Sequence, residues 1–148
     1  MLERGASVTG IDHSAASVAR SVSKVGGYME RGKASVDCGS VQSLPYAAGS
    51  FDLVTAFEVI YFWSDTEGAF KEVLRVLRPG GRFVVAMGAW KEDGGAIHCP
   101  KIFQQNLEMT LYSSKDLELL MSNAGFSSSE AMKGRKANWI AVSGRKDG

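Results

Sequence analysis

Residues 50–63 read SFDLVTAFEVIYFW and contain the clearest strand pattern of the chain. The segment Phe51–Ala56 is short and apolar, and Gly49-Ser50 leads into it, as is common for buried strands of parallel sheets. After it, Ser64 and Glu67 have the S-x-x-E spacing of a capping box, which predicts a helix start. An apolar stripe then recurs at helical intervals on one face, at Phe70, Val73, Leu74 and Leu77.

Further alternation of strands and helices is predicted on both sides of this segment. Arg78-Pro79-Gly80-Gly81 should end the helix and turn the chain into a strand at Gly81–Met87. Towards the N-terminus, a strand at Ala6–Ile11 ends at Asp12, Ser14 caps a helix that Gly26-Gly27 stop, and a second strand covers Ala34–Cys38. Short strands alternating with helices predict an α/β fold with a mostly parallel sheet.

The C-terminal third of the sequence predicts a long loop, a helix and an antiparallel hairpin. Ala89–Thr110 is a long, mixed segment suited to a substrate-side loop. A helix should begin at Ser113 or Ser114 and end at Gly125. Strand candidates near Ser127–Met132 and Asn138–Ser143 are so close in the chain that they should pair as an antiparallel hairpin.

Length and composition limit the functions to consider. The chain has 148 residues, of which 45% are apolar, which suits one domain over residues 1–148. Lys and Arg number 17 against 16 Asp and Glu, so neither nucleic acid nor an anionic membrane is the expected partner. Cys38 and Cys99 lack metal-ligand spacing, so no metal site is expected. Without a signal-peptide pattern or an apolar run of ~18 residues, the protein is expected in the cytoplasm.

Four motifs in this order resemble class I S-adenosylmethionine-dependent methyltransferases of the small-molecule type, a group with a Rossmann-like sheet. The motifs are Val8–Ser14 (VTGIDHS), Gly39-Ser40-Val41 with Leu44-Pro45-Tyr46 and Ser50–Val54, Phe57–Trp63 (FEVIYFW), and Leu74–Arg82 (LRVLRPGGR). The resemblance covers Glu3 to about Arg145. In the family a first strand and a G-x-G-x-G loop precede this region, so we expect an N-terminally truncated domain.

The resemblance implies a site for S-adenosylmethionine. Asp12 would bind both ribose hydroxyls, and its place at a strand's carboxyl end suits a carboxylate that meets a vicinal diol. His13 would flank the adenine. Ser40 stands where the family usually has an aspartate that takes the adenine amino group, so adenine recognition should be weaker or different. The full set of expected cofactor-binding residues is Asp12, His13, Ser40, Val41, Ala56, Phe57 and Glu58.

Each of these residues also has a simpler interpretation. Asp12 could cap the next helix, and His13 could be an ordinary solvated loop residue. Glu58 could hold the cofactor's amino group, take a substrate proton, or only face solvent. Tyr61, Phe62 and Trp63 could form a substrate-pocket wall or only core contacts. We name no catalytic residue, since methyl transfer mainly requires alignment of the nucleophile with the methyl group.

One further motif and two rival functions stay open. His98-Cys99-Pro100 is interpreted as ordinary loop, because no partner carboxylate is identifiable. The main prediction is methyl transfer to a small-molecule acceptor. The first rival is a non-catalytic module of the same fold that forms a homodimer through an exposed sheet edge. The second is a nicotinamide-dependent Rossmann domain, which Leu44-Pro45-Tyr46 and Arg78–Gly81 argue against.

Overall fold

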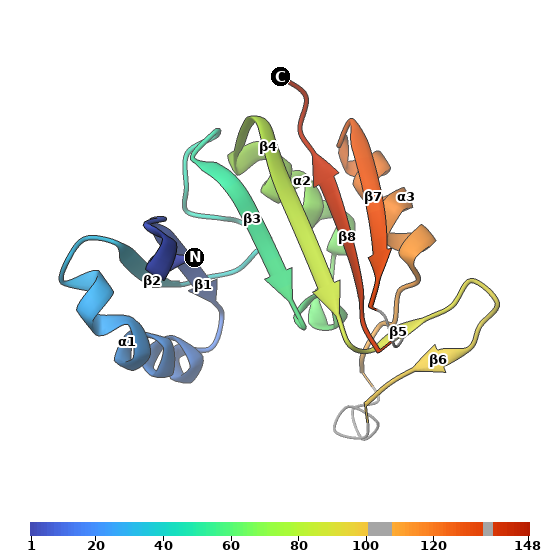
Figure 1. Cartoon of the computed structure of the whole chain (residues 1–148), viewed down its shortest axis with the longest axis horizontal. Helices are drawn as coiled ribbons and strands as arrows, with labels where there is room; N and C mark the ends of the chain where they lie inside the picture. Colours follow the sequence, from blue (N-terminus) through green and yellow to red (C-terminus); the bar gives the residue numbers. More distant parts are fainter. Residues whose placement is uncertain (101–107, 135–137) are drawn as a thin grey trace. The chain divides into compact units, whose positions relative to one another are not determined.

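The computed structural model describes residues 1–100, 108–134 and 138–148. By its internal contacts the chain divides into two compact units, unit 1 (Met1–Pro45) and unit 2 (Tyr46–Gly148) (Figure 1). Each unit is described by itself. The predictions of a single domain and of N-terminal truncation stay predictions.

Unit 1 is a strand-helix-strand unit preceded by a short 3-10 helix, η1 (Leu2–Arg4). Strands β1 (Val8–Asp12) and β2 (Ala34–Cys38) pair in parallel, in a register that places Asp12 beside Cys38. Helix α1 (Ala15–Met29) joins them and packs against both. Parallel pairing therefore brings the carboxyl ends of β1 and β2 to one edge of the unit.

Helix α1 does not stop at Gly26-Gly27, and that prediction is wrong. The helix continues to Met29, and the Glu30 N–H still donates to the Gly26 carbonyl at 2.9 Å. Glycine inside a helix costs about 1 kcal/mol relative to alanine but does not end it where the hydrogen-bond ladder continues. The chain reverses instead at Gly32, which has the positive φ of 65° that favours glycine.

Unit 2 contains a four-stranded sheet in the order β3-β4-β8-β7. Strands β3 (Phe51–Phe57) and β4 (Leu77–Met87) are parallel, and β8 (Ile140–Arg145) runs antiparallel to both β4 and β7 (Ser128–Lys133). The α/β fold and its C-terminal antiparallel hairpin are confirmed. The turn predicted between the last two strands falls partly on residues 135–137, outside the described residues.

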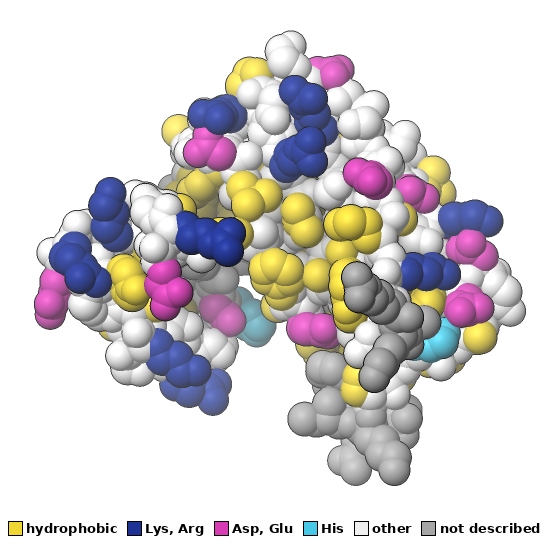
Figure 2. Space-filling model, viewed as in Figure 1, with side chains coloured by type: hydrophobic (Ala, Val, Ile, Leu, Met, Phe, Trp, Pro, Cys, Tyr) yellow, Lys and Arg dark blue, Asp and Glu magenta, His cyan; other side chains and the backbone are white. Residues whose placement is uncertain are grey.

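Helices α2 (Thr66–Val76) and α3 (Ser114–Ala124) lie together on one face of this sheet (Figure 1). Phe83 of β4 joins the layers, with its ring 5.0 Å from that of Phe70 on α2 and 5.9 Å from that of Phe126. Figure 2, in the same view as Figure 1, shows hydrophobic side chains gathered over the strands of unit 2. The contacts of Phe83 with Phe70 and Phe126 place the buried core between the sheet and its two helices.

The helix starts are partly as predicted. The N-cap of α2 is Asp65, which accepts the Gly68 N–H at 2.9 Å, so the box predicted from Ser64 and Glu67 is wrong. Aspartate caps as well as serine does, and sequence spacing alone does not choose between neighbours. In α3 the prediction is confirmed: Ser113 forms a full capping box with Asp116, and Gly125 ends the helix with φ 103°.

Strand β4 begins earlier than predicted, although the expected turn is present. The pairing with β3 jumps from Phe51↔Leu77 to Leu53↔Arg82, so residues 78–81 loop out of the ladder. Gly80 takes a positive φ of 75° there. Leu77 is the last residue of the predicted helical stripe, but it lies in a strand because it pairs with Phe51 of β3.

Beyond β4, a short hairpin follows within the long segment predicted as loop. Strands β5 (Trp90–Lys91) and β6 (Ile97–His98) pair antiparallel, and residues 101–107 of this segment lie outside the described residues. In the part of the chain that the structure describes, no helix combines the length and apolar character needed to span a membrane.

Candidate functional site

Asp12 is the last residue of β1, and its side chain is 41% exposed. Its Oδ1 accepts the Ser14 N–H at 2.8 Å, while Ser14 Oγ accepts the Ser17 N–H and caps α1. Asp12 is therefore not the helix cap. Its second carboxylate oxygen accepts no hydrogen bond from the described residues, and this end of the strand keeps an open anionic acceptor.

The loop after β2 joins Asp12 at the same edge of unit 1. The Gly39 N–H donates to the Asp12 carbonyl at 3.0 Å, and the Cys38 thiol lies 3.8 Å from the His13 carbonyl oxygen. The exposed His13 ring has Nδ1 3.7 Å from Asp12 Oδ1. The structure thus brings Asp12, His13 and the start of the Ser40 loop together at one edge of unit 1.

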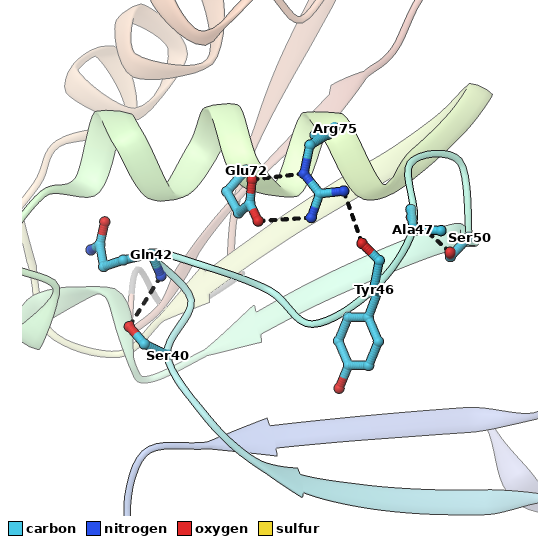
Figure 3. A network of polar contacts seen from close by, with 7 residues as sticks. All are labelled: Ser40, Gln42, Tyr46, Ala47, Ser50, Glu72 and Arg75. Atoms are coloured by element: carbon cyan, nitrogen blue, oxygen red, sulfur yellow. Dashed lines mark hydrogen bonds and ion pairs between the residues drawn. The ribbon is translucent and has the colours of Figure 1, made fainter.

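Ser40 is used by its own loop. Its Oγ accepts the Gln42 N–H at 3.1 Å (Figure 3), and Val41 between them is half-buried. A hydroxyl oxygen has two lone pairs, so one acceptor position of Ser40 remains. The Ser40 hydroxyl therefore stabilises its own turn. A ligand that donates a hydrogen bond to Ser40 would use the remaining lone pair of the same oxygen.

The Tyr46–Ser50 loop of unit 2 is fixed to α2. Arg75 donates from Nη1 to the Tyr46 carbonyl at 2.8 Å and from Nε and Nη2 to both oxygens of Glu72, and Ser50 donates to the Ala47 carbonyl (Figure 3). Bidentate guanidinium-carboxylate pairs orient the arginine firmly. The loop motif that carried the resemblance therefore has a structural role in unit 2.

Glu58 directly follows β3 and has an unusual backbone. Its φ is 56°, the only positive φ of a non-glycine residue in the described chain. Its N–H still donates to the Ala86 carbonyl of β4 at 3.0 Å. A side chain in the left-handed region costs about 1 kcal/mol, so the surrounding contacts must hold it there.

Those contacts form a group that we call the Glu58 clamp: Glu58, Tyr61, Gly88 and Ala89. Glu58 Oε1 accepts the Gly88 N–H at 2.6 Å, and Oε2 accepts the Tyr61 hydroxyl at 2.5 Å. Tyr61 Oη in turn accepts the Ala89 N–H at 3.1 Å. Burial, and then the hydrogen bond to the Glu58 carboxylate, raise the pKa of Tyr61 well above its usual value, so the phenol stays a neutral donor.

The other residues predicted at this strand end are divided between core and surface. Ala56 is buried, whereas Phe57 is 56% exposed. Tyr61 is buried, and its ring meets the exposed Phe62 edge to face at 5.9 Å. Trp63 packs on Phe70 of α2, which confirms the core interpretation for that residue. The role of Tyr61 in the clamp was not predicted, although the Glu-x-x-Tyr spacing was a usable signal.

His98 has the carboxylate partner that the sequence did not reveal. Its Nε2 lies 3.1 Å from Glu92 Oε1, and its ring stacks on Trp90 at 4.2 Å. The interpretation as ordinary loop without a partner is corrected, because the β5–β6 pairing brings the two residues together. Among the described residues, no group of His, Cys, Asp and Glu side chains could hold a metal ion.

Comparison with known proteins agrees with this architecture. The Methyltransferase domain family matches residues 1–85, more than half of the chain. The chain therefore belongs to the methyltransferase domain family, of the class I S-adenosylmethionine-dependent type. The O-methyltransferase cnsE of Penicillium expansum is 32% identical over 127 residues, which cover 82% of this chain and 44% of that protein.

Solved structures share the fold at lower identity. The [4+2]-cyclase SpnF superimposes with a TM-score of 0.79 at 20% identity, over 99% of this chain and 68% of the cyclase. A Haemonchus contortus N-methyltransferase bound to S-adenosylhomocysteine gives 0.78 at 17%, over 97% of this chain and 44% of that one. The chain spans less than half the length of the curated relatives it matches first. A cyclase on the same fold shows that the fold alone does not fix the reaction.

Proposed function

We propose that this chain is the methyltransferase part of an enzyme that transfers a methyl group from S-adenosylmethionine to a small molecule. Family membership supports the reaction class. The observation that carries the proposal is the exposed Asp12 carboxylate at the joined carboxyl ends of β1 and β2. Ligands of open α/β sheets bind at this end of the strands.

The residues of unit 1 fit the nucleoside part of this cofactor. One Asp12 oxygen is engaged by the Ser14 N–H and the other is open, so the carboxylate can accept from vicinal ribose hydroxyls without losing the turn. His13 offers an exposed ring beside it, and Ser40 and Val41 border the adenine in this proposal. The missing charge at Ser40 predicts modest selectivity for the adenine amino group.

Three of the expected cofactor-binding residues lie in unit 2. Glu58 presents an exposed, hydrogen-bonded carboxylate after β3, and Ala56 and Phe57 precede it. S-Adenosylmethionine supplies an activated methyl group on a positively charged sulfur. The protein's part is to bind and orient cofactor and acceptor, and no side chain is assigned as a base. We place this reaction in the cytoplasm.

A titration followed by amide NMR tests the nucleoside assignment. Addition of S-adenosylhomocysteine to the 148-residue chain should shift the amides of Asp12–Ser14 and Gly39–Val41 in a saturable way. Adenosine should shift the same amides more weakly. Saturable shifts at other amides of the chain, with both of these segments unchanged, would contradict the nucleoside assignment.

Self-association is a second candidate function, and one observation favours it. Strand β3 is the end strand of the described sheet of unit 2, and it exposes Leu53 (41%) and Phe57. Unpaired strand edges with apolar side chains favour pairing with another chain. Sedimentation analysis should then give a dimer that Leu53→Lys dissociates. A wild-type monomer at all concentrations would rule this candidate out.

A further inference from the structure

Two exposed arginines, Arg82 and Arg145, stand directly opposite each other in the sheet of unit 2, as partners in the antiparallel pairing of β4 with β8. Their neighbours face the helices, because Phe83 is fully buried and a Cβ on Gly144 would strike Met121 of α3. Side chains alternate between the two faces of a strand, so both arginines lie on the face opposite α2 and α3. Figure 2 shows Lys and Arg side chains gathered over the upper ends of β4 and β8.

Neither of these two arginines has an anionic partner within residues 1–100, 108–134 and 138–148. The other Lys and Arg side chains that the structure describes in unit 2 each have a partner: Lys71 with Glu67, Arg75 with Glu72, Arg78 with Asp52, Lys91 with Asp116, Lys115 with Asp93, Lys133 with the Trp90 ring, and Lys146 with the carbonyls of Leu74 and Leu77. Like charges directly opposite each other destabilise a sheet. An anion that binds both guanidinium groups would remove this repulsion.

A hollow of about 310 Å³ lies at this pair, and we call it the arginine hollow. Both arginines line it, together with Ser128, Ser129, Glu130, Ser143 and Gly144. In the pairing of β7 with β8, Ser128 opposes Arg145 and Ser143 opposes Glu130, so these side chains share the face of the arginines. Among the described residues, neither the Ser128 nor the Ser143 hydroxyl forms a hydrogen bond, which leaves both as donors for a ligand.

We propose that the arginine hollow binds the phosphate group of a small phosphate ester that carries hydroxyl groups. Guanidinium forks match phosphate oxygens, and the serine hydroxyls can donate to the same oxygens. Glu130 repels a free phosphate ion, but its carboxylate can accept hydrogen bonds from hydroxyls that neighbour the phosphate. The volume is at the lower end of the range for small-molecule sites, which suits a phosphate on a short carbon skeleton.

The arginine hollow is separate from the Glu58 clamp. Arg82 precedes Met87, the last residue of β4, by five positions, so about 17 Å of strand lies between it and that end. Glu58 follows the carboxyl end of β3 and bonds to Gly88, just after β4. Unit 2 alone builds the hollow, and this inference does not depend on the cofactor proposal. It adds a second binding site, for an anionic effector.

Titration of the 148-residue chain with ribose 5-phosphate, followed by amide NMR and calorimetry at constant ionic strength, tests this inference. We expect saturable shifts at the amides of Arg82, Ser128 and Arg145, and none with ribose. Arg82→Gln and Arg145→Gln should each lower the affinity roughly tenfold or more. Arg78→Gln is the matched control, because it removes the same charge from an arginine already paired with Asp52, and it should keep the affinity within about twofold.

Glu130→Gln tests how the ligand is oriented. It should tighten the binding of inorganic phosphate, because it removes a like charge from the hollow, and it should reduce the preference for ribose 5-phosphate over inorganic phosphate. An unchanged preference would contradict the contact between Glu130 and the ligand hydroxyls.

Thermal unfolding gives a readout that a merely structural arginine would not produce. Without ligand and at low salt, Arg82→Gln should raise the unfolding temperature, because it removes one of two opposed charges. Ribose 5-phosphate should raise the unfolding temperature of wild type and leave that of Arg82→Gln unchanged. An arginine that only supports the fold would destabilise the protein when replaced.

Three results would overturn the inference. The first is the absence of saturable ribose 5-phosphate binding by the folded wild-type chain. The second is binding that Arg82→Gln and Arg145→Gln leave unchanged, or that Arg78→Gln weakens as much as they do. The third is ribose binding as tight as that of ribose 5-phosphate, which would show that the phosphate is not recognised.

Discussion

The Tyr61 hydroxyl lies 2.5 Å from Glu58 Oε2, and it joins a phenol that is 1% exposed to a carboxylate that is open to solvent. The buried partner is held by the core of unit 2, and the open partner stands at the carboxyl end of β3. The hydrogen bond therefore restrains the exposed Glu58 carboxylate through a tyrosine that the core of unit 2 holds in place.

Tyr61→Phe should lower the free energy of unfolding by about 1–3 kcal/mol at neutral pH, because it leaves the Ala89 N–H and Glu58 Oε2 without their shared partner. The pKa of Tyr61 in the folded protein lies above its pKa in the unfolded chain, which is near 10. The stabilisation is thus fully present below pH ~10 and is lost as the pH rises above it. Urea unfolding of both proteins from neutral to alkaline pH measures this.

Tyr112→Phe is the matched control, because its phenol hydrogen-bonds the neutral Thr66 hydroxyl at 2.8 Å. The difference in stability between wild type and Tyr61→Phe should shrink at alkaline pH. A difference that stays constant, or one that Tyr112→Phe reproduces, would contradict the role given to Glu58.

Gly88→Ala should displace the Glu58 carboxylate, since the new Cβ would approach Oε1 to 3.0 Å. The carboxylate can move, so we expect a loss of only about 0.5–1.5 kcal/mol in the free energy of unfolding. Gly94→Ala is the control, because a Cβ there meets nothing within 4 Å. Because Gly88 and Tyr61 share one partner, Gly88→Ala should cost less in a Tyr61→Phe background. Strict additivity in the double mutant would count against the clamp.

Ser113→Ala should destabilise unit 2 by about 1 kcal/mol, since Ser113 Oγ caps α3 by accepting the Asp116 N–H at 3.2 Å. Thermal unfolding of the variant measures the loss. Ser114→Ala, one position further into the helix, removes a hydroxyl outside the capping box and should change stability within about 0.5 kcal/mol. Equal losses in both variants would show that the box adds nothing.

Much of the fold was predictable from local patterns. The apolar run at Phe51–Ala56 and the caps at Ser14, Ser113 and Gly125 each depend on a few neighbouring residues, and the structure places them as expected. The C-terminal hairpin was predictable for the same reason. The end of α1 was not, because Gly26-Gly27 stop a helix only if the following residues stop bonding back to it.

The candidate site was predictable only in part. Asp12 and Glu58 stand at strand ends, and strand ends can be found from sequence. The positive φ of Glu58 and its bond to Gly88 depend on how β4 ends beside β3, thirty residues away in the chain. The Glu92–His98 pair likewise needs the register of a two-residue hairpin, which no periodicity reveals.

Calorimetric titration of the folded 148-residue chain with S-adenosylhomocysteine tests the cofactor proposal most directly, with NADH as the control ligand. We predict saturable binding near micromolar affinity, no binding of NADH, and loss of binding in Asp12→Ala. Asp12→Asn keeps the acceptor for the Ser14 N–H and should bind with intermediate affinity. Absence of S-adenosylhomocysteine binding by folded protein, or binding that Asp12→Ala leaves unchanged, would contradict the account.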